Sequence, residues 1–493
     1  MKNLFFNICF FLDPSRKDKC SEFISELISI LTFIVNSKLF ILILIFLFVI
    51  LIKLIFLKTT DKFIDYLLPI FIFVLFCLIL ANFKTNLPWV DDWEWIENLQ
   101  TEKISVLEWL FQPTNIHNIF FIKLIFLLNN NFFNLNFLLF NYLSVIIIIL
   151  ITLIFIRNER ISNKIYLAFL IILIFSGKQF ANFSQASNIA WTICFFYIIL
   201  FKYLFDSNKL SRVIPCSVII FIAPLTFGLG YVLPLFILSF IYFFKININT
   251  KINYIIFSIA GILASYLIPK MLFDDLDGIT LGFNSLKIFL NLNFYLTFFG
   301  VLSNVFLPWV ERIAYLGVII GLGQFLIVLL IVSKKYHLNG FSSLNNFITN
   351  NIFIILGLIF AFIVSFTRSE LQTVVAARYS VGSIIFQLGF WLFLFKENKL
   401  NFMKNLNFIK ILTVYIFLSG LFFPYSGIHW QAKRHISNIN IVDCFKNNLL
   451  KETNNCNKLA YDTLFYGGKW YDFEIFENQI KVFKNKSKSF LNF

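Results

Sequence analysis

Long apolar runs recur along the chain and alternate with short polar connections. Many of these runs are roughly 17–22 residues long, the length that a helix needs to cross the hydrocarbon layer of a membrane. They lie at 39–57, 66–82, 136–156, 164–181, 189–205, 213–227, 229–244, 253–270, 313–333, 351–366, 381–396 and 408–423. The pattern predicts an all-α polytopic membrane protein with roughly 12–13 transmembrane helices.

Two segments fit this pattern less well. Residues 22–36 carry Glu22 and Glu26 on one side of a helix and apolar side chains on another, which is typical of an amphipathic helix in the membrane interface. Residues 286–307 are apolar but interrupted by Asn and Ser, so we expect them to be re-entrant or to lie along the interface. The expected divisions are an interfacial segment at 1–38, a transmembrane bundle at 39–423 and a small polar tail at 424–493.

The composition agrees with a membrane protein, because 59% of the 493 residues are hydrophobic and only 14% are charged. The net charge of +15 is explained by basic residues in cytoplasmic loops, without a nucleic-acid partner. The seven cysteines form neither a CxxC pair nor a Cys/His ligand spacing, so no zinc site is predicted. Only Cys444 and Cys456 share a polar segment, where they form either a disulfide or two free thiols.

Basic residues concentrate in one set of short connections, and this asymmetry orients the helices because positive loops stay in the cytoplasm. These connections contain Arg157, Arg160 and Lys164; Lys202, Lys209 and Arg212; Lys245 and Lys251; Lys334 and Lys335; and Lys396, Lys399, Lys404 and Lys410. The alternation of spans then predicts that 83–135, 177–188, 271–287 and 367–380 are extracytoplasmic. The tail joins them, provided that 286–307 does not fully cross the membrane.

The stretch "NLPWVDDWEWIENL" at 86–99 places four carboxylates and three tryptophans at the end of an apolar run. Tryptophan is ordinary at a membrane interface, but neighbouring carboxylates repel one another, so their clustering favours a function. In a close pair, one carboxylate can act as general base while the other orients it or binds a cation. Flat rings such as Trp93 also suit the apolar faces of a sugar.

An acidic pair in a first extracytoplasmic loop, directly after an early span, resembles the GT-C superfamily of membrane glycosyltransferases. The resemblance implies a polyprenyl-phosphate-linked sugar donor and a loop carboxylate that acts as catalytic base, or as a metal ligand in some branches. By position, Asp91 and Asp92 are the candidate catalytic residues and Glu94 is a supporting one. The resemblance requires no cofactor and is compatible with a divalent metal.

A second segment, "FQPTNIHNIFFIKLIFLLN" at 111–129, resembles a stretch of bacterial GT-C-like proteins. There, an Asn-Glu-His-Arg-like group precedes an apolar helix with a basic residue in its first turns. Asn115, His117 and Lys123 fit this pattern, while Ile116 and Asn118 replace its charged members. The alternative for His117 is an interfacial histidine with ordinary hydrogen bonds.

A third segment, "TRSELQTVVAARYS" at 367–380, resembles the Arg-Tyr found at the head of a late helix in proteins of this type. Arg368 and Arg378 lie on the predicted outer side, where arginine is disfavoured, and a guanidinium suits a lipid phosphate. By the same resemblance, Tyr379 is a candidate substrate-binding residue together with the two arginines. The alternative is that the arginines pair with Glu370 or with lipid headgroups.

Two weaker signals remain. Lys178 and Gln179 lie in the outward loop after an apolar run, and we expect them near the same outer surface. The Gly-containing "FGLG" at 227–230 is typical of a tight turn rather than a phosphate cradle.

These observations predict an inverting glycosyltransferase of the bacterial inner membrane, with its active site on the extracytoplasmic face. Its partners would be the lipid-linked sugar and a glycan, lipid or protein acceptor, with no nucleic acid. A glycan polymerase or ligase is the nearest alternative, and its catalysis would depend on basic residues in loops farther along the chain. A transporter or flippase is more distant, because paired charges near the middle of its helices would be expected.

Overall fold

The computed structural model of the chain describes residues 92, 95–96, 105–113, 118–133, 135–159, 161, 167, 170–171, 173–179, 182, 186–205, 207–273, 286–306, 315–339, 341–368, 379–396, 440–441, 443–444, 454–464, 473–474, 476–478 and 480. Every regular element within these residues is helical. The predictions for 22–36, 39–57, 66–82 and 408–423 lie outside them, and 164–181 is described only in part.

The helices fall where the longest apolar runs predict them. The first group comprises α6 (Val106–Phe111), α7 (Phe120–Phe132), α8 (Leu138–Glu159), η2 (Gly177–Gln179), α11 (Ile189–Leu204), α12 (Leu210–Thr226), η3 (Gly228–Tyr231), α13 (Val232–Phe240), η4 (Ile241–Phe243) and α14 (Ile248–Leu272). The second group comprises η6 (Leu286–Leu290), α15 (Leu292–Ser303), η7 (Asn304–Phe306), α16 (Tyr315–Asn339), α17 (Phe341–Asn350), α18 (Ile352–Arg368), α19 (Ser380–Lys396) and α21 (Asn454–Leu464).

Two of the described helices, α8 and α14, are long and apolar enough to cross a membrane by themselves. A third span arises if Leu344–Asn350 and Ile352–Thr367 count as one, although an 85° bend separates them. Several shorter apolar helices, among them α11, α12 and α19, pack beside these. The prediction of an all-helical fold is therefore confirmed for the described residues, and the expected number of spans stays a prediction.

The segment 286–307 is broken where its polar residues predict a break. The side chain of Asn291 caps α15 by accepting a hydrogen bond from the Asn293 N–H at 2.9 Å. At the other end, the Ser303 hydroxyl donates to the Gly317 carbonyl at 2.6 Å and ties α15 to α16. The result is a short helix of 12 residues followed by a 3₁₀ turn.

One face of α14 is exposed and entirely apolar. Ile252, Ile256, Ile259, Leu263 and Leu267 recur at helical spacing, and each side chain is at least 43% exposed. A soluble surface rarely presents so long an apolar stripe, whereas a lipid-facing helix requires one. The exposed residues of α8 and α16 form similar stripes, so these helices present the surface that lipid would cover.

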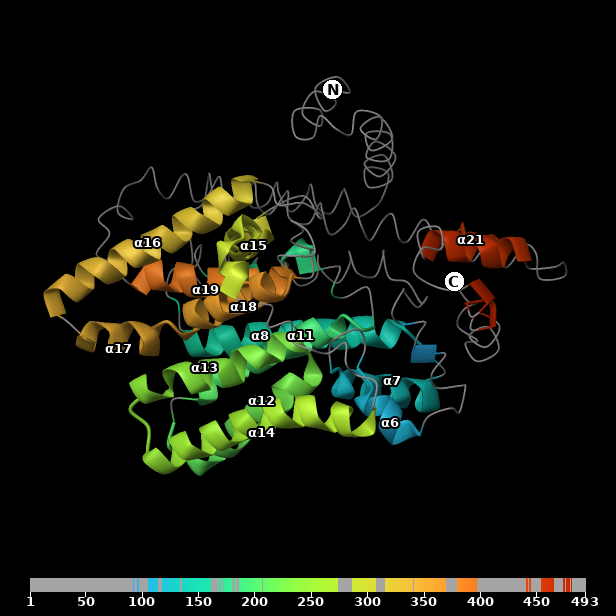
Figure 1. Cartoon of the computed structure of the whole chain (residues 1–493), viewed down its shortest axis with the longest axis horizontal. Helices are drawn as coiled ribbons and strands as arrows, with labels where there is room; N and C mark the ends of the chain where they lie inside the picture. The colour runs from blue at the N-terminus through green and yellow to red at the C-terminus, as the bar shows by residue number, and fades with distance from the viewer. Residues whose placement is uncertain are drawn as a thin grey trace, which may run out of the picture.

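Figure 1 shows α8, α11, α12, α13 and α14 running side by side, with α6, α7 and α21 toward one end of the molecule and α17 toward the other. We call the end that carries α6, α7 and α21 the loop end, and the end that carries α17 the basic end. At the basic end the aromatic rings of Phe205 and Phe244 stack edge to face with centroids 4.6 Å apart, joining the ends of α11 and α13. Asn208 accepts a hydrogen bond from the Asn247 N–H at 2.8 Å at the same end.

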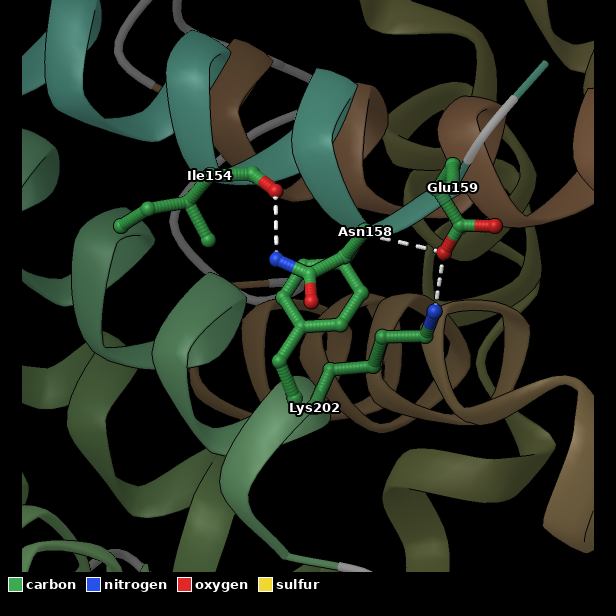
Figure 2. Close-up of polar contacts among 5 residues, drawn as sticks. Ile154, Asn158, Glu159 and Lys202 are labelled. Atoms are coloured by element: carbon green, nitrogen blue, oxygen red, sulfur yellow. Dashed lines mark hydrogen bonds and ion pairs between the residues drawn. The ribbon is translucent and has the colours of Figure 1, made fainter.

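A buried ion pair also holds the basic end together, as Figure 2 shows. Lys202 of α11 bonds the carboxylate of Glu159 at the end of α8, and the Tyr203 hydroxyl donates to the same carboxylate at 3.0 Å. The Lys202 ammonium also lies 5.2 Å from the ring centroid of Phe353, which joins α18 to the group. Connections predicted to share a side are therefore found at the same end of the bundle.

Candidate functional site

Asp92 is the member of the acidic pair that the structure describes, and it is buried. Its Oδ1 accepts a hydrogen bond from the Ser187 N–H at 3.0 Å, and its Oδ2 accepts one from the Ala186 N–H at 3.3 Å. These two residues form the turn directly before α11. Asp92 therefore anchors the sequence segment 86–99, which we call the acidic loop, to the start of α11, as a side chain that caps a helix does.

Trp95 belongs to a hydrophobic cluster and does not lie at the surface. Asp92, Trp95 and Ile96 have helical backbone, and their spacing puts them on one face. Trp95 is fully buried and meets Phe126 of α7 edge to face, with ring centroids 5.3 Å apart. The cluster extends through Trp109 of α6 to the start of α11. Polar and apolar anchors thus hold the same turn of the acidic loop.

The short helix α6 is capped at both ends. Ser105 and Glu108 form a capping box at its start, and these hydrogen bonds with Ser105 lower the pKa of the Glu108 carboxyl. At its end the buried Lys123 ammonium donates to the carbonyls of Trp109 at 2.9 Å and Gln112 at 2.6 Å. Carbonyls at a helix end lack partners within the helix, and a lysine satisfies them well. The described contacts of Lys123 therefore hold α6 against α7.

The start of α11 meets the start of α19 at the loop end. Trp191 of α11 packs edge to face on Tyr379, with ring centroids 5.6 Å apart, and on Phe227 at 4.7 Å. Phe360 of α18 completes the group around the same indole, at 6.1 Å. Tyr379 is buried and stands immediately before α19. Two segments that are distant in the sequence, the acidic loop and the head of α19, thus flank one helix end.

The short helix η2 packs against α19 and brings a buried lysine to this region (Figure 1). Lys178 is 1% exposed. Its neighbour Gln179 is also fully buried and donates through Nε2 to the Ile174 carbonyl at 2.5 Å. Burial of an ammonium group is costly unless other groups compensate its charge.

Several polar atoms of η2 and of the starts of α11 and α19 are buried without a hydrogen bond from a described residue. Within the part of the chain that the structure describes, no hydrogen bond reaches Gln179 Oε1, Ser187 Oγ, Thr192 Oγ1 or Ser380 Oγ. They belong to η2, to the turn that Asp92 holds, and to the first turns of α11 and α19.

The other sequence-predicted site residues are only partly placed. Asp91, Trp93, Glu94, Asn115, His117 and Arg378 lie outside the described residues. Arg368 is the last residue of α18, and the structure describes its backbone only. No cluster of three His, Cys, Asp or Glu side chains that could hold a metal occurs among the described residues.

The cysteines of the tail form a disulfide. Cys444 and Cys456 are bonded with their Cα atoms 5.7 Å apart, which decides between the two alternatives that the sequence left open. Such a bond is expected outside the cytoplasm, where the tail was predicted to lie.

Sequence reasoning did not single out Trp191, Thr192 or Ser380. Each is a common residue type at the start of an apolar helix, so no local pattern distinguishes it. Only the meeting of α11 and α19 in space gives these residues a shared environment. The prediction of a tight turn at "FGLG" is confirmed by η3, which joins α12 to α13.

No protein-family model matches the chain, and neither a curated protein nor a solved structure matches it.

Proposed function

We propose that the chain is a membrane glycosyltransferase. It would transfer a sugar from a polyprenyl-phosphate carrier to an acceptor hydroxyl of a cell-envelope glycan, lipid or protein, outside the cytoplasm. The observation that carries this proposal is that Asp92 and Tyr379 both contact the start of α11, Asp92 at the turn of Ala186 and Tyr379 at the ring of Trp191. These two residues come from separate segments that resemble the GT-C superfamily, so their convergence supports one site.

In this proposal Asp91 is the general base and Asp92 is its positioning neighbour. Both oxygens of Asp92 already accept backbone hydrogen bonds, which suits an anchoring carboxylate better than one that must accept a proton. The acceptor oxygen bonds to the anomeric carbon while its proton passes to the Asp91 carboxylate. The bond between that carbon and the phosphate oxygen breaks, and its electron pair stays on the phosphate. A single displacement of this kind inverts the anomeric centre.

The leaving phosphate gains negative charge and needs a cation beside it. Arg378 is the first candidate, with Arg368 and His117 as helpers. Lys178 joins them because it is buried and because η2, which carries it, packs against α19. The contacts of Lys123 with the carbonyls of α6 favour a structural role for it instead.

The Asp91→Asn and Asp92→Asn variants separate the two aspartate roles. We expect Asp91→Asn to abolish sugar transfer at a normal membrane level. Asp92→Asn should lower both the amount of protein and the transfer, because it weakens the anchor on α11. Glu97→Gln, in the same loop, is the matched control and should behave as wild type. The measurement is mass spectrometry of the surface glycan, with immunoblots of the membrane fraction and a deletion strain for reference.

Two results would contradict this proposal. If the deletion strain loses a sugar but both aspartate variants keep it, the base assignment is wrong. If the deletion strain keeps every sugar, the glycosyltransferase proposal is wrong.

Lys178→Met tests the anionic subsite. Methionine removes the charge but fills similar volume, and the membrane level of the variant separates a loss of stability from a loss of transfer. We expect at least a tenfold loss of transfer at unchanged membrane level, about the effect of one lost electrostatic contact to the leaving group. The exposed Lys209→Met variant at the basic end is the control. Full transfer by Lys178→Met would exclude the lysine from the site.

A further inference from the structure

The described part of the C-terminal segment closes on itself through three kinds of contact. The disulfide joins Cys444 to Cys456 at the start of α21. Farther along α21, the ring of Tyr461 packs on Phe473 and Phe476, with centroids 5.1 and 5.7 Å away. Asn457 also donates to the Glu477 carboxylate at 2.9 Å. The segment therefore has a defined arrangement, although it is short for a domain with its own core.

The buried side of this segment is shared with the acidic loop. Cys456, Tyr461 and Phe476 belong to the same hydrophobic cluster as Trp95 and Ile96. Phe476 and Trp95 are both 0% exposed. Figure 1 shows α21 and the C-terminal helical pieces at the same end as α6 and α7. The buried rings of both parts thus belong to one continuous hydrophobic cluster.

The acidic loop is therefore held at two points. The Asp92 carboxylate fixes it to the turn before α11 through two backbone hydrogen bonds. One helical turn later, Trp95 and Ile96 fix it to the shared cluster. Movement of the cluster would carry this turn with it, because three side chains on one helical face cannot move independently.

We propose that the disulfide-closed C-terminal segment is a positioning element for the acidic loop, acting through Phe476 and the Cys444–Cys456 bond. Its catalytic meaning rests on the proposed function, because the loop carries Asp91 beside Asp92. The mechanical coupling itself does not depend on which reaction the loop performs.

Hydrogen exchange on the full-length protein in detergent tests the coupling directly. Phe476→Ala removes the aromatic ring at the centre of the C-terminal contacts, and Phe476→Leu restores an apolar side chain in its place. Leu459→Ala is the matched control, since Leu459 lies on α21 but is 40% exposed. A Cys444→Ser/Cys456→Ser variant removes the disulfide while leaving the rings in place.

We expect the amides of 92–113 to exchange about tenfold faster in Phe476→Ala and in the double serine variant. Exchange in Phe476→Leu and Leu459→Ala should stay near wild type, and α8, α12 and α14 should be unchanged in all four. Unchanged exchange at 92–113 in Phe476→Ala would overturn the proposal. Faster exchange that extends equally to α8, α12 and α14 would overturn it too, because it would indicate general unfolding.

Sugar transfer supplies the second readout. We expect Phe476→Ala to lose transfer at a wild-type membrane level and Phe476→Leu to regain it. Normal transfer by Phe476→Ala together with fast loop exchange would overturn the positioning role. If the wild-type protein transfers no sugar, the glycosyltransferase proposal fails, while the exchange experiment still decides the coupling.

Discussion

At the scale of single residues, the buried carboxylate of Glu159 should be sensitive to substitution, because it is paired with Lys202. Its side chain is 3% exposed and depends on Lys202, whose side chain is 17% exposed. We expect Glu159→Gln to lower the free energy of unfolding by about 2 kcal/mol, below the ~3–5 kcal/mol of a fully buried pair. The measurement is the melting temperature in detergent.

The double variant Glu159→Gln/Lys202→Met provides the control for this pair. It leaves no uncompensated charge, so it should recover most of the stability that Glu159→Gln loses. A double variant as unstable as the sum of the two single changes would show that the pair is not coupled.

The sequence shows which residues are unusual, but it does not show which residues they contact. Clustered carboxylates marked the acidic loop, and Asp92 is indeed buried at the loop end. The hydrogen bonds of Asp92 with the backbone N–H groups of Ala186 and Ser187 could not be predicted, because no sequence pattern reveals them. The positive charge of Lys123 is compatible both with capping a helix and with binding a substrate. Only the structure shows that its ammonium donates to the carbonyls at the end of α6.

At the level of whole elements, glycine sets how closely some helices approach. A Cβ atom added at Gly261 of α14 would lie 2.7 Å from the Phe221 carbonyl oxygen of α12. Helices pack this tightly in membranes through small residues because lipid gives them no other hydrophobic driving force. The α12–α14 pair therefore depends on this position.

Gly261→Leu tests that dependence. We expect it to lower the free energy of unfolding by roughly 1–3 kcal/mol, since the side chain must push α12 and α14 apart. Gly323→Ala in α16 is the control, because an added Cβ there meets nothing within 4 Å and alanine favours a helix. Equal melting temperatures for the two variants would contradict a close-packing role for Gly261.

The apolar runs predicted where the helices lie more accurately than they predicted where the helices are interrupted. The run 229–244 became η3, α13 and η4, which continue from Gly228 to Phe243 without a gap, and the break before them lies at Phe227, whose backbone is extended. The break in 286–307 was predictable, since Asn291 is a good helix cap. The right-angled joint between α17 and α18 was not, because the packing of neighbouring helices decides such a bend.

For the molecule as a whole, the two ends of the bundle should face opposite sides of a membrane. Asn131 is exposed on α7 at the loop end, and Lys209 is exposed before α12 at the basic end. With an impermeant thiol reagent on intact cells, we expect Asn131→Cys to react and Lys209→Cys to react only after permeabilisation. The unsubstituted chain measures the background from native thiols. Reaction of Lys209→Cys on intact cells would overturn this orientation.

Loop charge alone predicted which connections share a side, and the contacts at the basic end agree with it. Lys202 lies in the last turn of α11, Lys209 belongs to the connection between α11 and α12, and Lys245 belongs to the connection between η4 and α14. Asn208 and Asn247 of these two connections are joined by a hydrogen bond. Charge could not reveal that the tail shares a core with the acidic loop, because that depends on apolar side chains far apart in the chain.

The shared core also has a consequence for how the protein is made. Trp95 and Ile96 leave the ribosome long before Cys444 and Phe476, yet they are buried in the same cluster. During synthesis this cluster cannot be completed until the C-terminal segment has been made. A nascent chain that stops before Phe476 would therefore leave Trp95 and Ile96 without part of their buried surroundings.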